Sequence, residues 1–353
     1  MYLDLVKIFV PTAFTFFLGL FFTPFATHFF YKYKMWKKKS RSLSATSPVF
    51  KSVHQSKEQS EVSVPCVGGI IIWMSVLLAV ALFFIVSVFF SSDLFIKLNF
   101  LSRSQTFIPI GIFVLGALLG LIDDMLEIKD RSDINRNSSW YTWVKVSAIV
   151  VMGILAGYWF FYKLGIDSIH IPFGGDLYLG ILIIPFFIIV ALATFSGGVI
   201  DGIDGLSGGV LASIFAAYSA IAFAHGQIDL AAFCGVVTGA ILAFLWFNIP
   251  PARFYMGETG MMPLTITLAT IAFLTDTVLL LPIIAFLLVV TSMSDIIQML
   301  SKKFRNGKKV FLIAPLHHHF EALGWPSYKV TMRYWVLSII FAIIGVILAI
   351  ISR

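Results

Sequence analysis

Two adjacent carboxylates, Asp123 and Asp124, end an uncharged apolar run and are the first residues of the chain with a clear chemical use. Carboxylates at the depth where lipid headgroups begin are costly unless they are solvated, paired or bound to a cation. Taken alone, the pair is explained equally well by a solvated helix end and by a cation site. Three further polar segments bear on this choice.

The second polar segment runs from Ile200 to Gly209 (IDGIDGLSGG) and holds Asp201 and Asp204. Glycines let the backbone approach a ligand, and the neighbouring carboxylates can accept hydrogen bonds from a base or a sugar. A sharp turn with incidental aspartates is the alternative. A Walker phosphate loop is excluded because no Gly-Lys-Ser/Thr sequence follows.

The third polar segment runs from Asn248 to Gly260 (NIPPARFYMGETG) and places Tyr255 and Glu258 beside two glycines. An aromatic side chain can stack on a nucleobase, and a nearby carboxylate can hold magnesium that bridges a pyrophosphate. Tyr255 equally fits an aromatic residue of the membrane interface. Glu258 has no such simple structural explanation.

The fourth polar segment holds three consecutive histidines, His317, His318 and His319, followed by Phe320 and Glu321. Imidazoles can donate hydrogen bonds to phosphate oxygens or bind a transition metal, and the nearby lysines and arginines favour a polyanionic ligand. A zinc site is not indicated, because the segment has neither a thiolate nor the HExxH spacing.

Composition shows which elements must position these segments. Hydrophobic residues make up 59% of the 353 residues and charged residues only 12%, about half the charged share of an ordinary soluble domain. Several apolar runs approach the roughly 20 residues that cross a membrane. The first, Phe9 to Phe30, is too long for a signal-peptide core, and we interpret it as a retained helix.

We therefore predict an all-α membrane protein, a single polytopic domain over 1–353. The ten predicted transmembrane helices span 8–30, 67–90, 107–122, 142–162, 178–195, 207–224, 230–248, 261–274, 277–299 and 332–351. The eighth is short and a tight break at 275–277 follows it, so nine crossings is the alternative. A small β-hairpin around Gly174 and Gly175 is predicted between the fourth and fifth helices.

Basic residues predict the orientation. They crowd two connections, a basic loop at 31–66 and the histidine-bearing loop at 300–331, whereas the connections near 91–106, 163–177 and 225–229 hold three in total. The positive-inside rule then places both termini outside and puts all four polar segments in the cytoplasm. The crowded residues are Lys32, Lys34, Lys37, Lys38, Lys39 and Arg41 in the first loop and Lys302, Lys303, Arg305, Lys308 and Lys309 in the last.

Other classes of protein fit less well. The net charge of +7 lies beside helix ends and not along an aromatic-lined groove, which argues against nucleic acid as a partner. No internal repeat suggests an inverted-repeat transporter. Carboxylates for a hard cation, imidazole and basic donors for phosphate, and an adjoining lipid phase together indicate phosphoryl transfer between a nucleotide substrate and a lipid phosphate.

At these residues the chain resembles the phospho-N-acetylmuramoyl-pentapeptide transferase family, part of the polyprenyl-phosphate N-acetylhexosamine-1-phosphate transferase superfamily. The resemblance covers nearly the whole chain, and the superfamily shares the aspartate motifs but usually not the triple histidine. It rests on the runs VPCVGG (64–69), IDD (122–124), DGIDGL (201–206), NIPPARFYMGETG (248–260) and APLHHHFEALGW (314–325).

The resemblance implies ten helices, a homodimer and Mg²⁺ in the bacterial cytoplasmic (inner) membrane, with the active site facing the cytoplasm. The implied reaction moves phospho-N-acetylmuramoyl-pentapeptide from its UDP carrier to undecaprenyl phosphate and releases UMP. It also implies catalytic roles for Asp123, the base on the lipid phosphate, and for Asp124 and Glu258, which hold the magnesium. Implied substrate-binding residues are Asp204 and Tyr255 for the uridine, Asn248 and Asp201 in the same pocket, and His317, His318 and His319 near the diphosphate and sugar.

Three residues depart from the family's pattern. Glu258 replaces an aspartate, Gly198 replaces an asparagine, and Glu61 replaces a lysine for which Lys57 is a substitute. These departures keep two alternatives open: a related transferase that takes UDP-N-acetylglucosamine or another UDP-sugar, and a catalytically weakened lipid-phosphate binding protein. Direct attack by the lipid phosphate and a covalent enzyme intermediate also both remain open.

Overall fold

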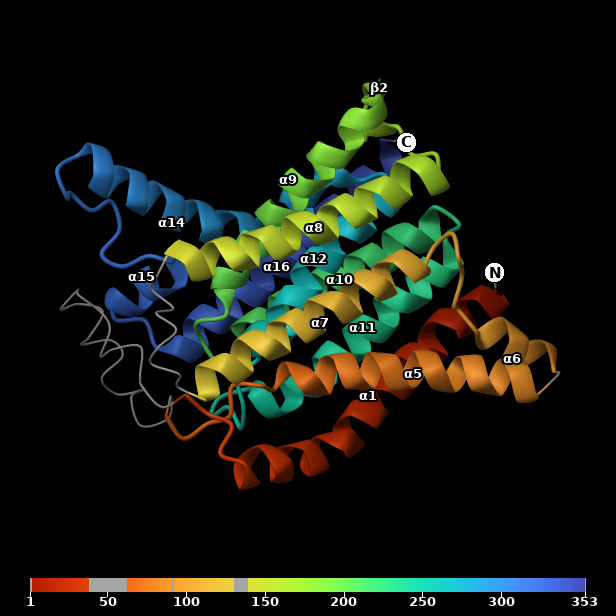
Figure 1. The fold of residues 1–353 in the computed structure, drawn as a ribbon, viewed down its shortest axis with the longest axis horizontal. Helices are drawn as coiled ribbons and strands as arrows, with labels where there is room; N and C mark the ends of the chain where they lie inside the picture. The colour runs from red at the N-terminus through yellow and green to blue at the C-terminus, as the bar shows by residue number, and fades with distance from the viewer. Residues whose placement is uncertain (1, 38–61, 91, 130–138, 353) are drawn as a thin grey trace.

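The computed structural model describes residues 2–37, 62–90, 92–129 and 139–352, which form a bundle of long helices (Figure 1). Within these ranges nine helices are long and apolar enough to cross a membrane, or ten if one bent pair counts as a span. The nine spans contain α1 (Tyr2–Lys32), α5 (Gly69–Phe89), α7 (Phe107–Ile128), α8 (Ser139–Lys163), α9 (Ile183–Ser196), α10 (Leu206–Ala224), α11 (Ile228–Asn248), α12 (Gly257–Leu274) and α16 (Ser327–Ile351). Helix α9 reaches the length of a span only with the 3-10 turns on either side of it, over Gly180–Ile200. A mostly helical polytopic protein is confirmed, and the side on which the termini lie stays a prediction.

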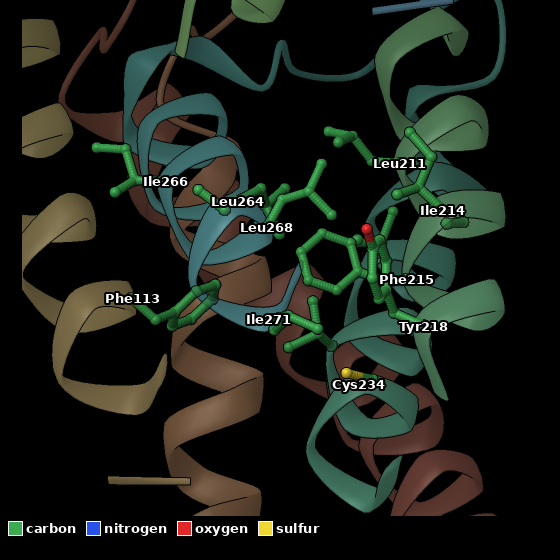
Figure 2. Packing of buried hydrophobic residues seen from close by; sticks show 14 of the residues in the cluster. Phe113, Leu211, Ile214, Phe215, Tyr218, Cys234, Leu264, Ile266, Leu268 and Ile271 are labelled. Carbon is green, nitrogen blue, oxygen red and sulfur yellow. The ribbon is translucent and has the colours of Figure 1, made fainter. Parts of the chain in front are cut away.

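Helices α10, α11 and α12 form the enclosed centre of the bundle, and the others surround them. Helix α7 packs along α12, and α1 packs along α11. Figure 2 shows Leu268 and Ile271 of α12 on the side that faces Leu211 and Phe215 of α10. Two buried threonines of α12 donate their hydroxyls to carbonyls of their own helix, Thr265 to Met261 at 2.8 Å and Thr270 to Ile266 at 3.3 Å, which lets them lie within this apolar packing.

The predicted helix 277–299 differs from the structure. It is divided into a 3-10 turn (Val278–Leu280), α13 (Leu281–Ile284) and α14 (Phe286–Phe304), with an 83° bend at Ala285. The polar residues of α14 gather on its buried side, among them Ser294, Gln298 and Ser301, while Met299 and Phe304 are exposed. Helix α14 is therefore amphipathic, which the high overall hydrophobicity of residues 277–299 did not reveal. It extends away from the bundle (Figure 1).

The predicted hairpin is confirmed. Strand β1 (Ser168–Ile171) pairs antiparallel with β2 (Gly175–Tyr178), and Ser168 lies opposite Tyr178. Because Tyr178 pairs in this sheet, the fifth helix cannot begin at 178 as predicted. A 3-10 turn, Gly180–Leu182, leads into α9 instead.

Several other boundaries move. Helix α12 starts at Gly257 and not at 261, so Glu258 lies in its first turn, and α16 starts at Ser327 and not at 332. Two short helices, α6 (Asp93–Leu98) and α15 (Leu316–Ala322), were not predicted, and α15 carries the histidines of the 300–331 loop. The predictions for Lys38, Lys39, Arg41, Lys57 and Glu61, and most of the 31–66 loop, lie outside the described residues.

Candidate active site

The end of α7 meets the start of α12 through Asp124. Its carboxylate accepts hydrogen bonds from the backbone N–H of Thr259 at 2.8 Å, the Thr259 hydroxyl at 2.6 Å and the backbone N–H of Glu258 at 3.2 Å. The first N–H groups of a helix have no partner within the helix, so a carboxylate from another helix can cap them. Asp124 thus fixes the position of Glu258.

Two glycines allow this approach. A Cβ atom on Gly120 would lie 2.2 Å from the carbonyl oxygen of Glu258, so only glycine lets α7 come this close to α12. Gly257 has φ +65°, a conformation that side chains rarely adopt, and a Cβ there would lie 2.1 Å from the Cys66 carbonyl oxygen. The glycine of the MGETG motif is therefore required by backbone conformation and by space.

The segment Val64–Gly69 holds the same loop from the other side. Tyr255 donates its N–H to Pro65 O at 2.8 Å, and Gly68 donates its N–H to Tyr255 O at 2.8 Å. Burial raises the pKa of the neighbouring Cys66 thiol to about 12. Cys66 therefore stays protonated near neutral pH and is no candidate nucleophile.

A lysine that the sequence analysis did not select joins the catalytic candidates. Lys145 Nζ lies 3.0 Å from Asp123 Oδ2 and 3.3 Å from Glu258 Oε1. Tyr141, one helical turn earlier in α8, donates its hydroxyl to the other oxygen of Asp123. One ammonium group thus bridges carboxylates from two helices and offsets one of their two negative charges.

These residues open onto a cavity of about 650 Å³. Its wall combines segments that are far apart in sequence: the ends of α7 and α9, the starts of α8 and α12, α14, and the start of α15. The polar lining residues are Lys37, Asp123, Asp124, Glu127, Tyr141, Thr142, Lys145, Ser196, Asp201, Glu258, Asp295 and His318. A pocket of this size and polarity suits a phosphorylated substrate.

The glycine-rich segment and the histidines pack against each other at the cavity edge. A Cβ atom on Gly202 would lie 2.3 Å from His317 Nε2 and 2.8 Å from His318 Nε2, so the imidazoles rest on the backbone of this glycine. Asp201 accepts a hydrogen bond from Ser207 at 2.7 Å. The DGIDG and triple-histidine motifs are therefore two halves of one surface.

A hydrogen-bond chain orients His318. Its Nδ1 lies 2.7 Å from Glu321 Oε2, and Ser327 donates to the other oxygen of Glu321 at 2.5 Å. With Nδ1 engaged, Nε2 is the atom that lies toward Gly202. This arrangement fixes the orientation of the ring and leaves Nε2 as the nitrogen that can form a hydrogen bond at the cavity.

The polar side of α14 holds the histidine-bearing loop. Gln298 accepts hydrogen bonds from the N–H groups of Val310 and Phe311 and donates to the carbonyl of Phe311. Ser294 accepts from the N–H of Leu316 at 2.9 Å. The bend before α14 therefore matters for the site, because it places the polar side of α14, which holds the histidine-bearing loop, beside the cavity.

Five predicted site residues are not among the described residues that line the cavity: Asn248, Asp204, Tyr255, His317 and His319. Asn248 is buried and fixes two loops, accepting from Gly205 N–H at 2.9 Å and donating to Phe254 O at 2.8 Å. Asp204 accepts from the N–H of Ala252. His319 Nδ1 accepts from the N–H of Leu312. Their substrate-binding roles stay predictions.

The cavity wall also includes Lys145, Tyr141 and Asp295, which were not predicted as site residues from the sequence. A signal existed for Lys145 and Asp295, because each is a charged residue inside a predicted transmembrane helix, where charges are rare and mark functional sites. Lys37 and Glu127 form a second ion pair at the cavity, 3.0 Å apart. Lys37 had been counted only as part of the basic loop.

The donor set fits a magnesium ion. An ionised carboxylate has about four acceptor positions, and hydrogen bonds fill three on Asp124, which leaves one. Asp123 and Glu258 add oxygens on either side of Lys145. Mg²⁺ binds through one or two carboxylates, with waters and phosphate oxygens completing its shell, so no larger cluster of protein ligands is needed.

Comparisons with known proteins identify the family of the chain. Residues 106–276 match the model of glycosyl transferase family 4. The chain is 33% identical to the phospho-N-acetylmuramoyl-pentapeptide-transferase of Geobacillus sp. (strain WCH70), covering 82% of this chain and 84% of that one. The enzyme of the same name from Chloroflexus aurantiacus (strain ATCC 29366 / DSM 635 / J-10-fl) is 34% identical (82% and 78%), and that of Anoxybacillus flavithermus (strain DSM 21510 / WK1) is 31% identical (83% and 85%). The chain therefore belongs to the family of the phospho-N-acetylmuramoyl-pentapeptide-transferases, within glycosyl transferase family 4.

Proposed function

We propose that this membrane enzyme transfers phospho-N-acetylmuramoyl-pentapeptide from its UDP carrier to undecaprenyl phosphate, giving the first lipid intermediate of peptidoglycan and UMP. The relatives described above are named for the transfer of phospho-N-acetylmuramoyl-pentapeptide, and they match about four fifths of the chain. The single observation that carries the proposal is the network in which Lys145 joins Asp123 and Glu258 at a polar cavity. It gathers at one place the groups that phosphoryl transfer requires.

The chemistry requires an attack between two anions. An oxygen of the lipid phosphate forms a bond to the sugar-linked phosphorus, and the bond from that phosphorus to the bridging oxygen of UMP breaks. Asp123 keeps the lipid phosphate deprotonated, and Lys145 offsets negative charge as the leaving UMP oxygen gains it, with His318 adding to this when its ring is protonated. Direct attack is the simpler course, because an ionised phosphate is already a nucleophile.

Enzymes of this family typically use Mg²⁺. We infer that Glu258 and Asp124 hold the ion, with Asp123 close by. The ion would supply charge neutralisation for the diphosphate of the donor. The protein's own contribution is the fixed position of Glu258, which the hydrogen bonds to Asp124 determine.

We infer that the cavity faces the cytoplasm, with both termini outside, and that the protein lies in a bacterial inner membrane. Basic residues near the cavity end of the bundle, including Lys37, Lys302 and Lys303, support this orientation. A cytoplasmic cavity would meet a soluble nucleotide donor and a membrane lipid at one place. The homodimer implied by the family resemblance belongs to the same proposal.

The test measures UMP release by the purified protein with undecaprenyl phosphate, Mg²⁺ and either UDP-N-acetylmuramoyl-pentapeptide or UDP-N-acetylglucosamine. We expect release with the first donor. Release with only the second would overturn the donor assignment, and release with neither would favour a lipid-phosphate binding protein.

Variants then test the assigned residues. Asp123→Asn and Glu258→Gln should each abolish turnover, because the first removes the base and the second removes a magnesium ligand. Asp93→Asn, the same substitution on exposed α6, is the control and should retain full activity. Unchanged rates in both site variants would remove these carboxylates from the mechanism.

A further inference from the structure

A second polar cluster lies at the opposite end of the bundle from the cavity, where the hairpin, the turn after α12 and the end of α16 meet (Figure 1). His170 of β1 is its centre. Its backbone N–H donates to Asp276 Oδ1 at 2.9 Å, and its Nδ1 lies 2.8 Å from Asp176 Oδ1 of β2. The assigned active site uses none of these residues.

We propose that His170, Asp176 and Asp276 form a binding site for a divalent transition-metal ion of the zinc class. One ligand atom from each side chain, an imidazole nitrogen and two carboxylate oxygens, lies within 4.8 Å of the other two. Among the described residues this is the one group of three such side chains that meets this distance. Imidazole and carboxylate ligands suit Zn²⁺ and its neighbours in the first transition row.

The second ring nitrogen of His170 supports the assignment. Nε2 lies 2.9 Å from the carbonyl oxygen of Ser352, which can only accept, so Nε2 carries a proton. In the neutral ring this leaves the lone pair on Nδ1, the nitrogen that faces Asp176. Metal-binding histidines are commonly held in one tautomer by such a hydrogen bond to a backbone carbonyl.

The surroundings allow an ion to enter. Asp176 is 66% exposed, whereas His170 is 18% exposed, so the site opens to solvent on the carboxylate side and is closed behind the ring. Asp276 has φ +54°, in the left-handed region that aspartate tolerates better than most residues, and this turn directs its carboxylate to the hairpin. A bound ion would join three segments that are distant in sequence.

A protonated His170 is the competing explanation. The hydrogen bond to Asp176 raises the pKa of His170, so a proton on Nδ1 can hold the same two carboxylates without a metal. Raising the pH removes this proton and favours the metal. Zinc binding should therefore be measured at pH 8, where proton and metal compete least.

The experiment titrates ZnCl₂ into the full-length protein, with any affinity tag removed, in detergent at pH 8 and follows bound zinc and Tm. We expect the wild type to bind one more equivalent of zinc than His170→Gln and to gain Tm on binding. His28→Gln, which removes a histidine from exposed α1, is the matched control and should bind as the wild type does.

Asp176→Asn is a second test of the site in case the His170 variant misfolds. Because Asp176 is exposed, its substitution should leave the Tm of the zinc-free protein unchanged while weakening zinc binding at least tenfold. Equal zinc stoichiometry and affinity in the wild type, His170→Gln and Asp176→Asn would overturn the site and leave the protonated histidine as the explanation. The triple histidine cannot confuse this outcome, because it is present in all variants.

Discussion

Replacing Lys145 with methionine should disable the enzyme more than it unfolds it. The ammonium lies 3.0 Å from Asp123 and 3.3 Å from Glu258. At an effective dielectric constant of about 20, each ion pair is worth about 5 kcal/mol before desolvation is subtracted. Lys145 is 21% and Glu258 34% exposed, so solvent screening reduces this, and a loss of about 3 kcal/mol is the expected cost. If the charge that develops on the phosphate groups loses the same stabilisation in the transition state, kcat/KM falls about 150-fold.

The assay compares initial rates of UMP release for the wild type, Lys145→Met and Lys145→Arg at saturating lipid phosphate. Lys163→Met is the matched control, because Lys163 is the exposed last residue of the same helix, α8. Lys145→Arg keeps the charge and should retain more activity than Lys145→Met. Size-exclusion profiles and Tm values separate loss of function from loss of fold. If folded Lys145→Met retains kcat/KM within about threefold of the wild type, the electrostatic argument is wrong.

Three further substitutions test the cavity. Gly198→Asn restores the family's residue where a Cβ meets nothing nearer than 3.9 Å, so Tm should hold and KM for the UDP donor should fall; a large drop in Tm would contradict the space inferred there. Gly202→Ala places a methyl 2.3 Å from His317 Nε2 and should cost about 1–3 kcal/mol of stability and most of the activity; wild-type Tm and rate would refute the tight packing. Glu258→Asp keeps the charge and should recover most of the UMP release that Glu258→Gln loses, whereas equal loss would show that position matters more than charge.

Much of the fold could be predicted because membrane helices are recognised from the length of their apolar runs. An apolar run must satisfy every backbone group within itself, so a run of about 20 residues forms a helix regardless of its neighbours. The hairpin was predictable for a similar local reason, the two glycines at its turn. The bend at Ala285 was not, because it depends on which side of α14 is buried against the rest of the protein.

The candidate site divides in the same way. Asp123, Asp124, Glu258 and His318 were identified from local motifs, and the structure brings all four to one cavity. Lys145 was overlooked, because its partners are 22 and 113 residues away in sequence. The motif containing Asn248 also predicted a ligand-binding role for this residue. In the structure its side-chain oxygen and nitrogen both form hydrogen bonds with backbone groups of neighbouring loops.

By itself the sequence determined the helical membrane architecture, the four polar segments and the family, because each depends on the types of residues that lie close together in the sequence. Only the tertiary structure decided which charges pair, which motif residues face the cavity and where the ninth predicted helix bends. The physical reason is that a carboxylate's role depends on the donors around it. Asp123 and Asp124 are adjacent in sequence, yet one binds an ammonium group and a phenol while the other caps α12.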